Sequence, residues 1–417
     1  MPLQPGWSDA AQADALGTHA LELIRAAWGK RLGPHELATA RQVQFQLRPG
    51  AGTSIVYSLR HGTTERFIGL STEVIDAPDG PRLRHLELPV APTAGPTSTS
   101  GVPLRVASWL HPHDPRLPGL AHAGVASEAE RLWGDGDRLT RLRTVTYRPL
   151  RRAVFRAEFS TPGPVVATRR VYLKAMRPEP ARDLELRHRL LTAAQLPVAP
   201  LLGEVVHGVV ATAGMPGEPL STLLRYDGAG QLDPRALVRL LDRLPDTVLE
   251  LPHRPSWSDR IERYAGAATT TLPGREADIA ALTLRLRALI DAHDPGPVVP
   301  VHGDFYEANV LISDGAVCGL LDLDSVGPGH RVDDLACLLG HLAVLPSVDR
   351  GYGGIWETIG RWAQVFGETV DERALYARAA AVAVSLVAGA RRPGMTSWTQ
   401  QAQARLDAAQ RLADLAG

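Results

Sequence analysis

The segment that decides the fold of this 417-residue chain is PVHGDFYEANVLISDGAVCGLLDLDSVGPGHRVDDLA, residues 300–336. It joins an H-G-D-x-x-x-x-N loop to a second acidic turn, L-L-D-L-D. Two apolar runs, 310–312 and 317–321, lie on either side of a Ser-Asp-Gly turn and predict a β-hairpin. Such a hairpin brings Asp304, Asn309 and Asp322 to one end although they are far apart in sequence. Three oxygen-bearing side chains that converge in this way suit Mg²⁺.

The composition is typical of a soluble globular protein and argues against several kinds of partner. Hydrophobic residues make up 44% of the chain, charged residues 22%, and the formal net charge is zero. Because the arginines are spread along the chain, we expect no nucleic-acid-binding surface and no membrane-binding surface. The first residues lack a signal-peptide pattern, and the longest apolar run, 379–390, is too short to span a bilayer. Two cysteines without a C-x-x-C partner favour a reduced, cytoplasmic protein.

Lysine and asparagine are unusually rare in this chain. Only two of the 45 Lys and Arg residues are Lys (Lys30 and Lys174), and Asn309 is the only asparagine. Both residue types have AT-rich codons, so their rarity indicates a GC-rich genome that replaces them wherever it can. Those that remain are more often chemically required. Lys30 lies in an ordinary polar context, whereas Asn309 lies inside H-G-D-x-x-x-x-N.

Residues 1–130 predict a small N-terminal α+β module. Residues 8–30 repeat apolar side chains at helical spacing, and three alternating stretches (43–47, 54–59 and 65–70) predict a small antiparallel sheet. Residues 91–103, rich in Pro, Thr, Ser and Gly, predict a linker or a mobile loop, and a further strand is expected at 104–109. The following loop contains His111-x-His113-Asp114, which has the residue types of a metal site but no matching ligand pair nearby.

The rest of the chain divides into a β-rich part, 131–215, and a helical part, 216–417. Three β-rich runs (144–148, 153–159 and 165–174) are followed by a helix over 180–194 and by strands over 201–204 and 205–213. After these, helical periodicity dominates apart from the hairpin. The helices are expected at 219–225, 233–250, 258–267, 275–293, 334–345, 355–366, 372–389 and 397–416.

A β-rich lobe with a strand lysine, a helix, and then a helical lobe with H-G-D-x-x-x-x-N and an acidic turn form a specific order. In these features the chain resembles the aminoglycoside phosphotransferase/choline kinase family, within the protein-kinase-like fold. The resemblance is carried by Lys174, residues 302–309, the acidic turn at Asp322, and Asp334-Leu-Ala. It covers about 142–345 and does not cover 1–130. It implies an α+β, bilobal fold with a β-rich N-lobe and a helical C-lobe, preceded here by a small α+β domain.

The resemblance also implies roles for the motif residues, and elementary chemistry agrees with them. Phosphoryl transfer depends mainly on positioning and charge neutralisation. Asp304 would act as the general base for an attacking hydroxyl. Asn309 and Asp322 would hold Mg²⁺ together with phosphate oxygens and water. Lys174 would contact the α- and β-phosphates of ATP, steadied by Glu185, for which Asp183 and Glu179 are rivals. The family's hinge implies that backbone groups of Ala211, Thr212, Ala213 and Met215 meet the adenine edge.

Other polar residues near the motif have less specific expectations. Glu307 and Arg331 flank the site and are candidates for substrate contact. Three roles remain open for Asp324: a second metal ligand, a substrate contact or an ordinary solvated acid. His302 is expected to hold the loop, and Asp334 resembles the family's aspartate that hydrogen-bonds the catalytic-loop backbone. The turn from Arg148 to Arg152 contains no glycine, whereas protein kinases cover the phosphates with G-x-G-x-x-G; Arg151 or Arg152 would supply charge there instead.

These features predict an ATP- and Mg²⁺-dependent kinase that phosphorylates a hydroxyl group of a small molecule. An aminoglycoside, an amino sugar, a sugar or a related metabolite are all open as acceptors, and no dense acidic cluster marks a polycationic pocket. The extra N-terminal module gives, by analogy, the alternative of a capped sugar kinase of the maltokinase or glucosamine kinase type. A hypothesis from another class is a catalytically silent, nucleotide-binding regulatory protein. The intact set of Lys174, Asp304, Asn309 and Asp322 argues against it.

Overall fold

The structure is a computed structural model, and it describes residues 4–48, 50–61, 64–89, 102–161, 167–390 and 397–417. Its contacts divide the chain into two compact units. Unit 1 comprises Met1–Arg182 and Leu201–Gly214, and unit 2 comprises Asp183–Pro200 and Met215–Gly417. Unit 1 holds the predicted N-terminal module and most of the predicted N-lobe, and the border between these two stays a prediction. The overall class, a β-sheet N-terminal region followed by a helical C-terminal region, is as expected.

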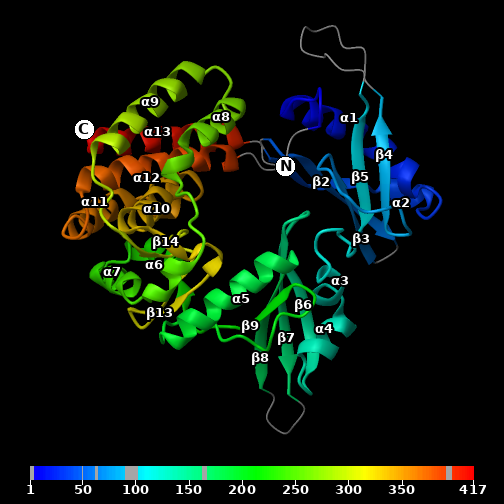
Figure 1. The fold of residues 1–417 in the computed structure, drawn as a ribbon, viewed down its shortest axis with the longest axis horizontal. Coiled ribbons are helices and arrows are strands. Elements are labelled where there is room, and N and C mark those ends of the chain that lie inside the picture. Colours follow the sequence, from blue (N-terminus) through cyan, green and yellow to red (C-terminus); the bar gives the residue numbers. More distant parts are fainter. Residues whose placement is uncertain (1–3, 49, 62–63, 90–101, 162–166, 391–396) are drawn as a thin grey trace. The chain divides into compact units, whose positions relative to one another are not determined.

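The first half of unit 1 is an antiparallel sheet with a long helix against one face (Figure 1). The helix α1 (Asp9–Trp28) begins at Ser8, whose Oγ accepts a hydrogen bond from Ala11 N at 3.2 Å. Its apolar side, including Ile24 and Trp28, packs with Ile55 and other buried sheet residues. A short helix, α2 (Pro34–Ala38), follows α1. The strand order is β1-β2-β3-β5-β4, with β1 (Arg41–Arg48), β2 (Gly52–His61), β3 (Thr64–Ser71), β4 (Leu83–Leu88) and β5 (Leu104–Leu110).

The second half of unit 1 is a four-stranded sheet in the order β6-β7-β8-β9. Its strands are β6 (Arg138–Arg148), β7 (Arg152–Ser160), β8 (Thr168–Met176) and β9 (Val209–Ala213). Side chains alternate across the pleat, so one face carries Phe155, Phe159 and Leu173, which are buried with Leu120 and Trp133. The last two residues lie on the short helices α3 (Leu120–Ala123) and α4 (Ala126–Trp133), which the sequence did not predict.

Unit 2 is mainly helical, and α12 lies in the middle between α10 and α13 (Figure 1). Residues 233–250, expected as one helix, instead form α7, a break at Pro245, and a 3₁₀ helix, Asp246–Glu250. The other predicted helices are present. The helices are α5 (Pro178–Ala193, which begins in unit 1), α6 (Leu220–Asp227), α7 (Arg235–Asp242), α8 (Ile261–Thr271), α9 (Glu276–Ala292), α10 (Arg331–Val344), α11 (Ile355–Phe366), α12 (Glu372–Val387) and α13 (Trp398–Ala416).

The hairpin predicted from the sequence is present and is joined by a third short strand. Strands β12 (Val310–Ser313) and β13 (Ala316–Leu320) are antiparallel, and β10 (Glu218–Pro219) pairs with β12. The two turn residues both have positive φ, +52° at Asp314 and +74° at Gly315, which the twist of a tight hairpin favours. Next to it, β11 (Val298–Val301) pairs with β14 (Gly327–His330), and these two strands bracket the motif segment.

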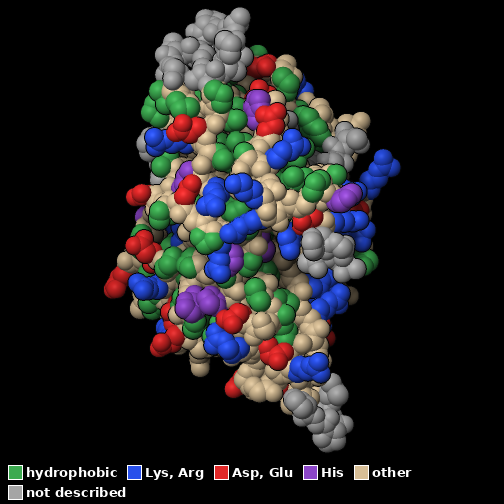
Figure 2. All heavy atoms as spheres, turned by 90° about the vertical axis from the view of Figure 1, so that its right-hand side faces the viewer, with side chains coloured by type: hydrophobic (Ala, Val, Ile, Leu, Met, Phe, Trp, Pro, Cys, Tyr) green, Lys and Arg blue, Asp and Glu red, His purple; other side chains and the backbone are tan. Residues whose placement is uncertain are grey.

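Within the described residues, one helical segment is long and apolar enough to cross a membrane, by length and composition only. It is Glu372–Ala390, which contains α12, and 72% of its most apolar window is buried inside the protein. This burial is typical of a core helix. On the face drawn in Figure 2, positive and negative side chains are interspersed, as the zero net charge leads one to expect. Most of the predicted linker at 91–103 lies outside the described residues.

Candidate active site

A buried carboxylate holds the backbone of the H-G-D segment in place. Asp334, in the first turn of α10, accepts hydrogen bonds from His302 N and Gly303 N, each at 2.7 Å. The side chain of His302 is fully buried, and its Nε2 lies 2.9 Å from the carbonyl oxygen of Leu321. Because a carbonyl only accepts, Nε2 carries the proton. His302 thereby links the loop to the second acidic turn.

Gly303 is required by its surroundings. Its φ is +77°, and a Cβ atom placed on it would lie 2.6 Å from the carbonyl oxygen of Ser325. Any side chain would therefore push the H-G-D loop away from the segment that follows Asp322. The small residue next to Asp304 allows the two acidic segments to pack closely.

Asn309 and Asp322 lie at the same end of the hairpin. The register pairs Val310 with Leu320, and beyond this pair Leu321 N donates to the Asn309 carbonyl at 2.8 Å. Asn309 Nδ2 donates to the Asp304 carbonyl at 2.9 Å, which fixes the orientation of the amide group. Asp322 has left-handed backbone angles, φ 56° and ψ 60°, a conformation in which aspartate is among the better tolerated residues.

The donor set at this end fits Mg²⁺ when a nucleotide supplies further oxygens. An amide and a carboxylate offer the hard oxygen ligands that Mg²⁺ prefers. Among the residues that the structure describes, no group of three or more His, Cys, Asp and Glu side chains is placed to hold a metal ion. Asn309 and Asp322 would supply two oxygen ligands to the ion, and phosphate oxygens and water would supply the others.

Lys174 lies in unit 1 on the sheet face opposite to the buried core. It is paired in register with Val154 of β7 and Val210 of β9, and the residue pair Arg152 and Met176 comes next. Its neighbours along β8, Leu173 and Ala175, point to the other face and are fully buried. Val154 and Val210 were not singled out from the sequence. They place an apolar side chain on each side of Lys174. The alternation of side chains along β7 and β9 could have indicated them.

The predicted adenine-binding residues lie where the chain passes from unit 1 to unit 2. Ala211, Thr212 and Ala213 end β9, and the change of unit comes between Gly214 and Met215. Gly214 N donates to the Arg170 carbonyl at 2.8 Å, which secures the end of the strand in unit 1. The contact of these residues with adenine stays a prediction.

Glu185, the predicted partner of Lys174, lies on the part of α5 that belongs to unit 2. Its Oε1 accepts a hydrogen bond from Arg189 Nη2 at 2.7 Å, an i,i+4 ion pair on the helix. Its rival Asp183 contributes its carbonyl to Arg187 Nη1 at 3.0 Å. The partner of Lys174 stays a prediction.

Glu307 is a buried carboxyl within the loop between Asp304 and Asn309. Only 5% of the residue is exposed, and burial raises the pKa of the carboxyl to about 7. The ring of His341 lies 4.0 Å from its Oε2 and stacks on Tyr306 with ring centres 4.2 Å apart. Burial lowers the pKa of His341 to about 3, so the imidazole is neutral and the two groups do not form an ion pair. Such a buried position makes Glu307 an unusual substrate contact.

Arg331 is directed toward protein groups. Its Nη2 donates to the Leu241 carbonyl at 3.1 Å and lies 3.3 Å from Asp242 Oδ1. Asp324 belongs to the 3₁₀ helix Leu323–Ser325 that follows Asp322. Nearby, the buried guanidinium of Arg187 donates from Nε to the Val326 carbonyl at 2.9 Å and so holds this turn against α5.

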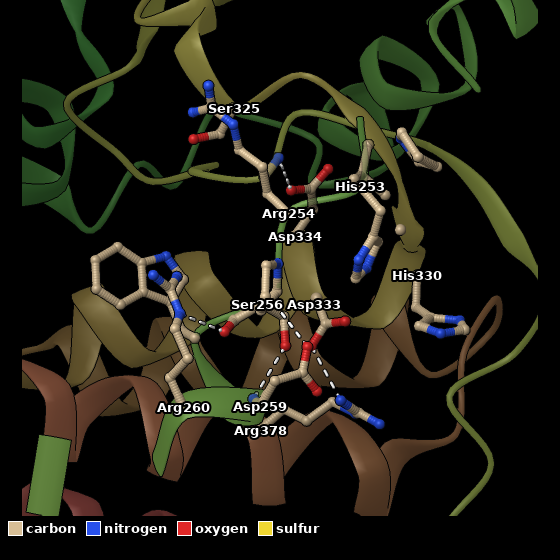
Figure 3. A pocket seen from close by; sticks show the side chains of 16 residues that line it. His253, Arg254, Ser256, Asp259, Arg260, Ser325, His330, Asp333, Asp334 and Arg378 are labelled. Carbon is tan, nitrogen blue, oxygen red and sulfur yellow. Dashed lines mark hydrogen bonds and ion pairs between the residues drawn. The ribbon is translucent and has the colours of Figure 1, made fainter. Parts of the chain in front are cut away.

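A pocket of about 780 Å³ lies beside the loop, entirely within unit 2. Figure 3 shows Asp333, Asp259 and Arg378 gathered at one side and Ser325 at the other. Gly303, the residue before Asp304, is part of its lining. The segment 253–260, which was not singled out from the sequence, supplies much of the wall: His253, Arg254, Pro255, Ser256, Trp257, Asp259 and Arg260.

The carboxylates of this pocket already have partners. Asp334 is held by the loop backbone, as described above. Asp333 Oδ1 accepts from Ser258 Oγ and from Arg378 Nη1, both at 3.1 Å. Asp259 Oδ2 accepts from Ser256 N at 2.7 Å. The pocket therefore presents arginine, histidine and hydroxyl groups more than it presents carboxylates in need of a partner.

An aromatic and cationic stack stands at the start of α8. The guanidinium of Arg260 lies 5.2 Å from the ring centre of Trp257 and 5.5 Å from that of Tyr264. Burial raises the pKa of Tyr264, and the negative charge of Asp304 raises it further, although the charges of Arg260 and Arg263 act in the opposite direction.

A family comparison supports the resemblance drawn from the sequence. Residues 165–365, slightly less than half of the chain, match the model of the phosphotransferase enzyme family. This region includes Lys174, the H-G-D-x-x-x-x-N loop and the acidic turn. The match confirms the resemblance for the part of the chain that carries these motifs. No curated protein sequence matches the chain.

Several solved structures are similar at low sequence identity. A ternary complex of a thermostable mutant of aminoglycoside phosphotransferase APH(4)-Ia with ADP and hygromycin B is 16% identical (TM-score 0.44), covering 69% of this chain and 98% of that one. Macrolide 2'-phosphotransferase MphH from Brachybacterium faecium is 19% identical (TM-score 0.39; 67% and 98% covered). A choline/ethanolamine kinase family protein from Mesorhizobium loti is 16% identical (TM-score 0.46; 70% and 92% covered). With TM-scores below 0.5, these chains say nothing about the acceptor of this one.

Proposed function

We propose that this protein is an ATP- and Mg²⁺-dependent phosphotransferase that phosphorylates a hydroxyl group of a small molecule in the cytoplasm. The observation that carries the proposal is the hairpin end of unit 2. There, Asp334 fixes the H-G-D backbone while Asn309 and Asp322 are brought to one end by the strand register. The family match to residues 165–365 supports the same reaction class.

In this proposal each residue has a separate role. Asp304 orients the acceptor hydroxyl and takes its proton while the new bond to the γ-phosphorus forms and the bond between that phosphorus and the departing ADP breaks. Lys174 neutralises charge on the phosphates of ATP. Asn309 and Asp322 hold Mg²⁺, which when bound neutralises the charge of the transferred phosphoryl group. Asp334 keeps the loop in place and does not contact the reacting atoms.

The pocket beside the loop is the proposed acceptor site, because Gly303 joins its lining to Asp304. Its carboxylates are occupied by protein donors, which leaves little to pair with several ammonium groups. The hydroxyl, histidine and arginine groups, with the indole of Trp257, suit the hydroxyls and apolar faces of a sugar. We therefore favour a sugar or related polyol over a polycationic aminoglycoside, in line with the capped sugar kinase alternative.

The experiment is to measure ATP consumption with Mg²⁺ against a panel of sugars, amino sugars and aminoglycosides. We expect at least one acceptor, from the sugars, to stimulate turnover. Asp304→Asn should abolish that turnover while nucleotide binding is largely kept. If the variant and the wild type consume ATP at equal rates, Asp304 is not the base. If nucleotide binds but no acceptor stimulates turnover, the silent nucleotide-binding protein becomes the better hypothesis.

A further inference from the structure

The turn without glycines in the second sheet of unit 1 is tied to the N-terminal module by one carboxylate. Asp114, which follows β5, is only 3% exposed. Its Oδ2 accepts hydrogen bonds from Leu150 N at 2.8 Å and from Tyr147 Oη at 2.9 Å. Its Oδ1 accepts from Arg116 N at 3.0 Å, which orients the carboxylate within its own loop. The hydrogen bond from the Leu150 amide fixes the backbone of the turn directly.

Apolar packing reinforces this hold. Leu150 is fully buried and packs with Leu83, Ala107 and Trp109 of the N-terminal sheet. Trp109 Nε1 donates to Tyr147 Oη at 3.1 Å, so the indole and the carboxylate share one phenol. The side chain of Trp109 lies over Gly69 so closely that a Cβ atom there would be 2.1 Å from the ring. A side chain at position 69 would therefore displace the indole that packs on Leu150.

The conformation of the turn itself needs such support. Leu150 has φ of +61°, which is unfavourable for a residue with a branched side chain. In a glycine-rich turn this conformation has no such cost. Here the burial of Leu150 and the hydrogen bond from its amide to Asp114 offset the unfavourable backbone conformation.

The turn lies at the end of the sheet that carries Lys174. Arg152, directly after the turn, is paired with Met176, and Val154 is paired with Lys174. The turn and the lysine are therefore near neighbours along the sheet. If the proposed function is right, this turn takes the place of the glycine-rich loop that covers phosphates in protein kinases.

We propose that Asp114 is a positioning residue for ATP, through which the N-terminal module holds the turn from Arg148 to Arg152 in its nucleotide-covering conformation. The effect on ATP binding rests on the proposed function, whereas the contacts between Asp114 and the turn all lie within unit 1. This hold gives the N-terminal module a specific role: its residues fix the conformation of a turn that has no glycine to adopt that conformation without cost. It also explains His111-x-His113-Asp114 without a metal, because His111 packs edge-on against Tyr147 at 5.3 Å.

The first test measures the turn directly, without any nucleotide. Amide hydrogen exchange of the peptide containing Leu150 is compared between wild type, Asp114→Ala and Asp114→Asn. We expect faster exchange in Asp114→Ala, and an intermediate rate in Asp114→Asn, which keeps one acceptor oxygen. Equal protection in all three proteins would show that Asp114 does not clamp the turn, that is, does not hold it through the Leu150 amide. Tyr147→Phe, a milder change that leaves the Leu150 bond intact, should increase exchange less than Asp114→Ala does.

The second test links the clamp to the nucleotide. We expect Asp114→Ala to weaken ATP binding and raise the KM for ATP by about tenfold, with a smaller change in kcat and in the acceptor KM. Ser108→Ala is the matched control: it removes the buried hydrogen bond from Trp28 Nε1 (2.9 Å) elsewhere in the same module and should leave ATP binding unchanged. Faster exchange with unaltered ATP affinity would overturn the positioning role. A wild type that binds no nucleotide would overturn the proposed function, while the exchange data would still decide the clamp.

Discussion

Asp334 and Gly303 are joined by a 2.7 Å hydrogen bond between a fully buried carboxylate oxygen and the backbone amide directly before the predicted base. The other oxygen of Asp334 binds the preceding amide at the same distance. A carboxylate that accepts two backbone hydrogen bonds fixes both position and orientation. The H-G-D loop is therefore anchored to α10, whose residues are mostly buried in unit 2.

Replacing Asp334 by alanine should disturb catalysis more than its distance from the chemistry suggests. Two charge-assisted bonds are lost, and two buried amides are left without their acceptor, at a cost of about 2–4 kcal/mol in the free energy of unfolding. A displaced Asp304 should lower kcat by about 100-fold. The measurements are urea unfolding and steady-state kinetics with the acceptor found in the panel. Asp371→Ala, which removes the 2.8 Å cap of α12, is the control: it should lower stability but leave kcat unchanged.

The two lysines provide a matched pair of substitutions. Lys174→Met should raise the dissociation constant for ATP by about 10- to 100-fold, because a charge-assisted contact to phosphate is lost while most of the unbranched, apolar part of the side chain is kept. Lys30→Met removes the only other lysine and should leave ATP binding as it is. Calorimetric titration of both variants with ATP and Mg²⁺ measures the difference. Equal affinities for the two variants would contradict the role given to Lys174.

The metal assignment can be tested without turnover. Asn309→Ala and Asp322→Ala each remove one proposed oxygen ligand, so we expect ATP binding to lose most of its dependence on Mg²⁺. The affinity for ATP is measured at increasing Mg²⁺ concentration in wild type and in each variant. Asp314→Ala, at the exposed turn of the same hairpin, is the control. Variants that follow the Mg²⁺ titration of the wild type would rule out these two residues as ligands.

Glu307 should make stability depend on pH in a definite direction. Its pKa is raised from 4.5 to about 7 by burial, so the folded state holds the proton more tightly than the unfolded state does. The wild type therefore loses stability as pH rises from about 4.5 to about 7, and Glu307→Gln lacks this loss. Relative to wild type, the variant should gain about 3 kcal/mol in the free energy of unfolding across that window.

Urea unfolding of wild type and Glu307→Gln at pH 4.5 and pH 8 measures this gain. Parallel pH profiles for the two proteins would show that Glu307 titrates as an ordinary carboxyl. Glu357→Gln, an exposed acid at the start of α11, is the control and should follow the wild type at both pH values. His341 acts in the opposite direction, since its lowered pKa makes the wild type lose stability as pH falls below 6.5.

The local features of unit 2 could be predicted because their signals are local. The hairpin was predictable from two apolar runs around Ser313, Asp314 and Gly315, and most helices from their periodicity. The helix predicted over 233–250 was too long because Pro245 ends it. The helices α3 and α4 are short, at four and eight residues, and therefore give little periodic signal.

What could not be predicted depends on contacts between distant residues. Asp114 and Leu150 are 36 positions apart, and nothing in either segment announces the other. In the same way, Ser258, Asp333 and Arg378 meet from three separate elements, so the wall of the pocket has no sequence spacing to recognise. Residue types at fixed spacing predict the phosphate chemistry, whereas the pocket proposed for the acceptor is built by tertiary packing alone.

The last strand of the second sheet in unit 1 has a consequence for how this unit is made. Strand β9 pairs with β8 from Val171 to Ala175, yet it is synthesised only after α5. A fragment that stops at Arg182 would present β8 as an open edge, and such edges pair readily with other chains. On the ribosome, the sheet that bears Lys174 stays incomplete until residue 213 has emerged. Any truncation meant to isolate unit 1 must therefore extend to Gly214 and carry α5 with it.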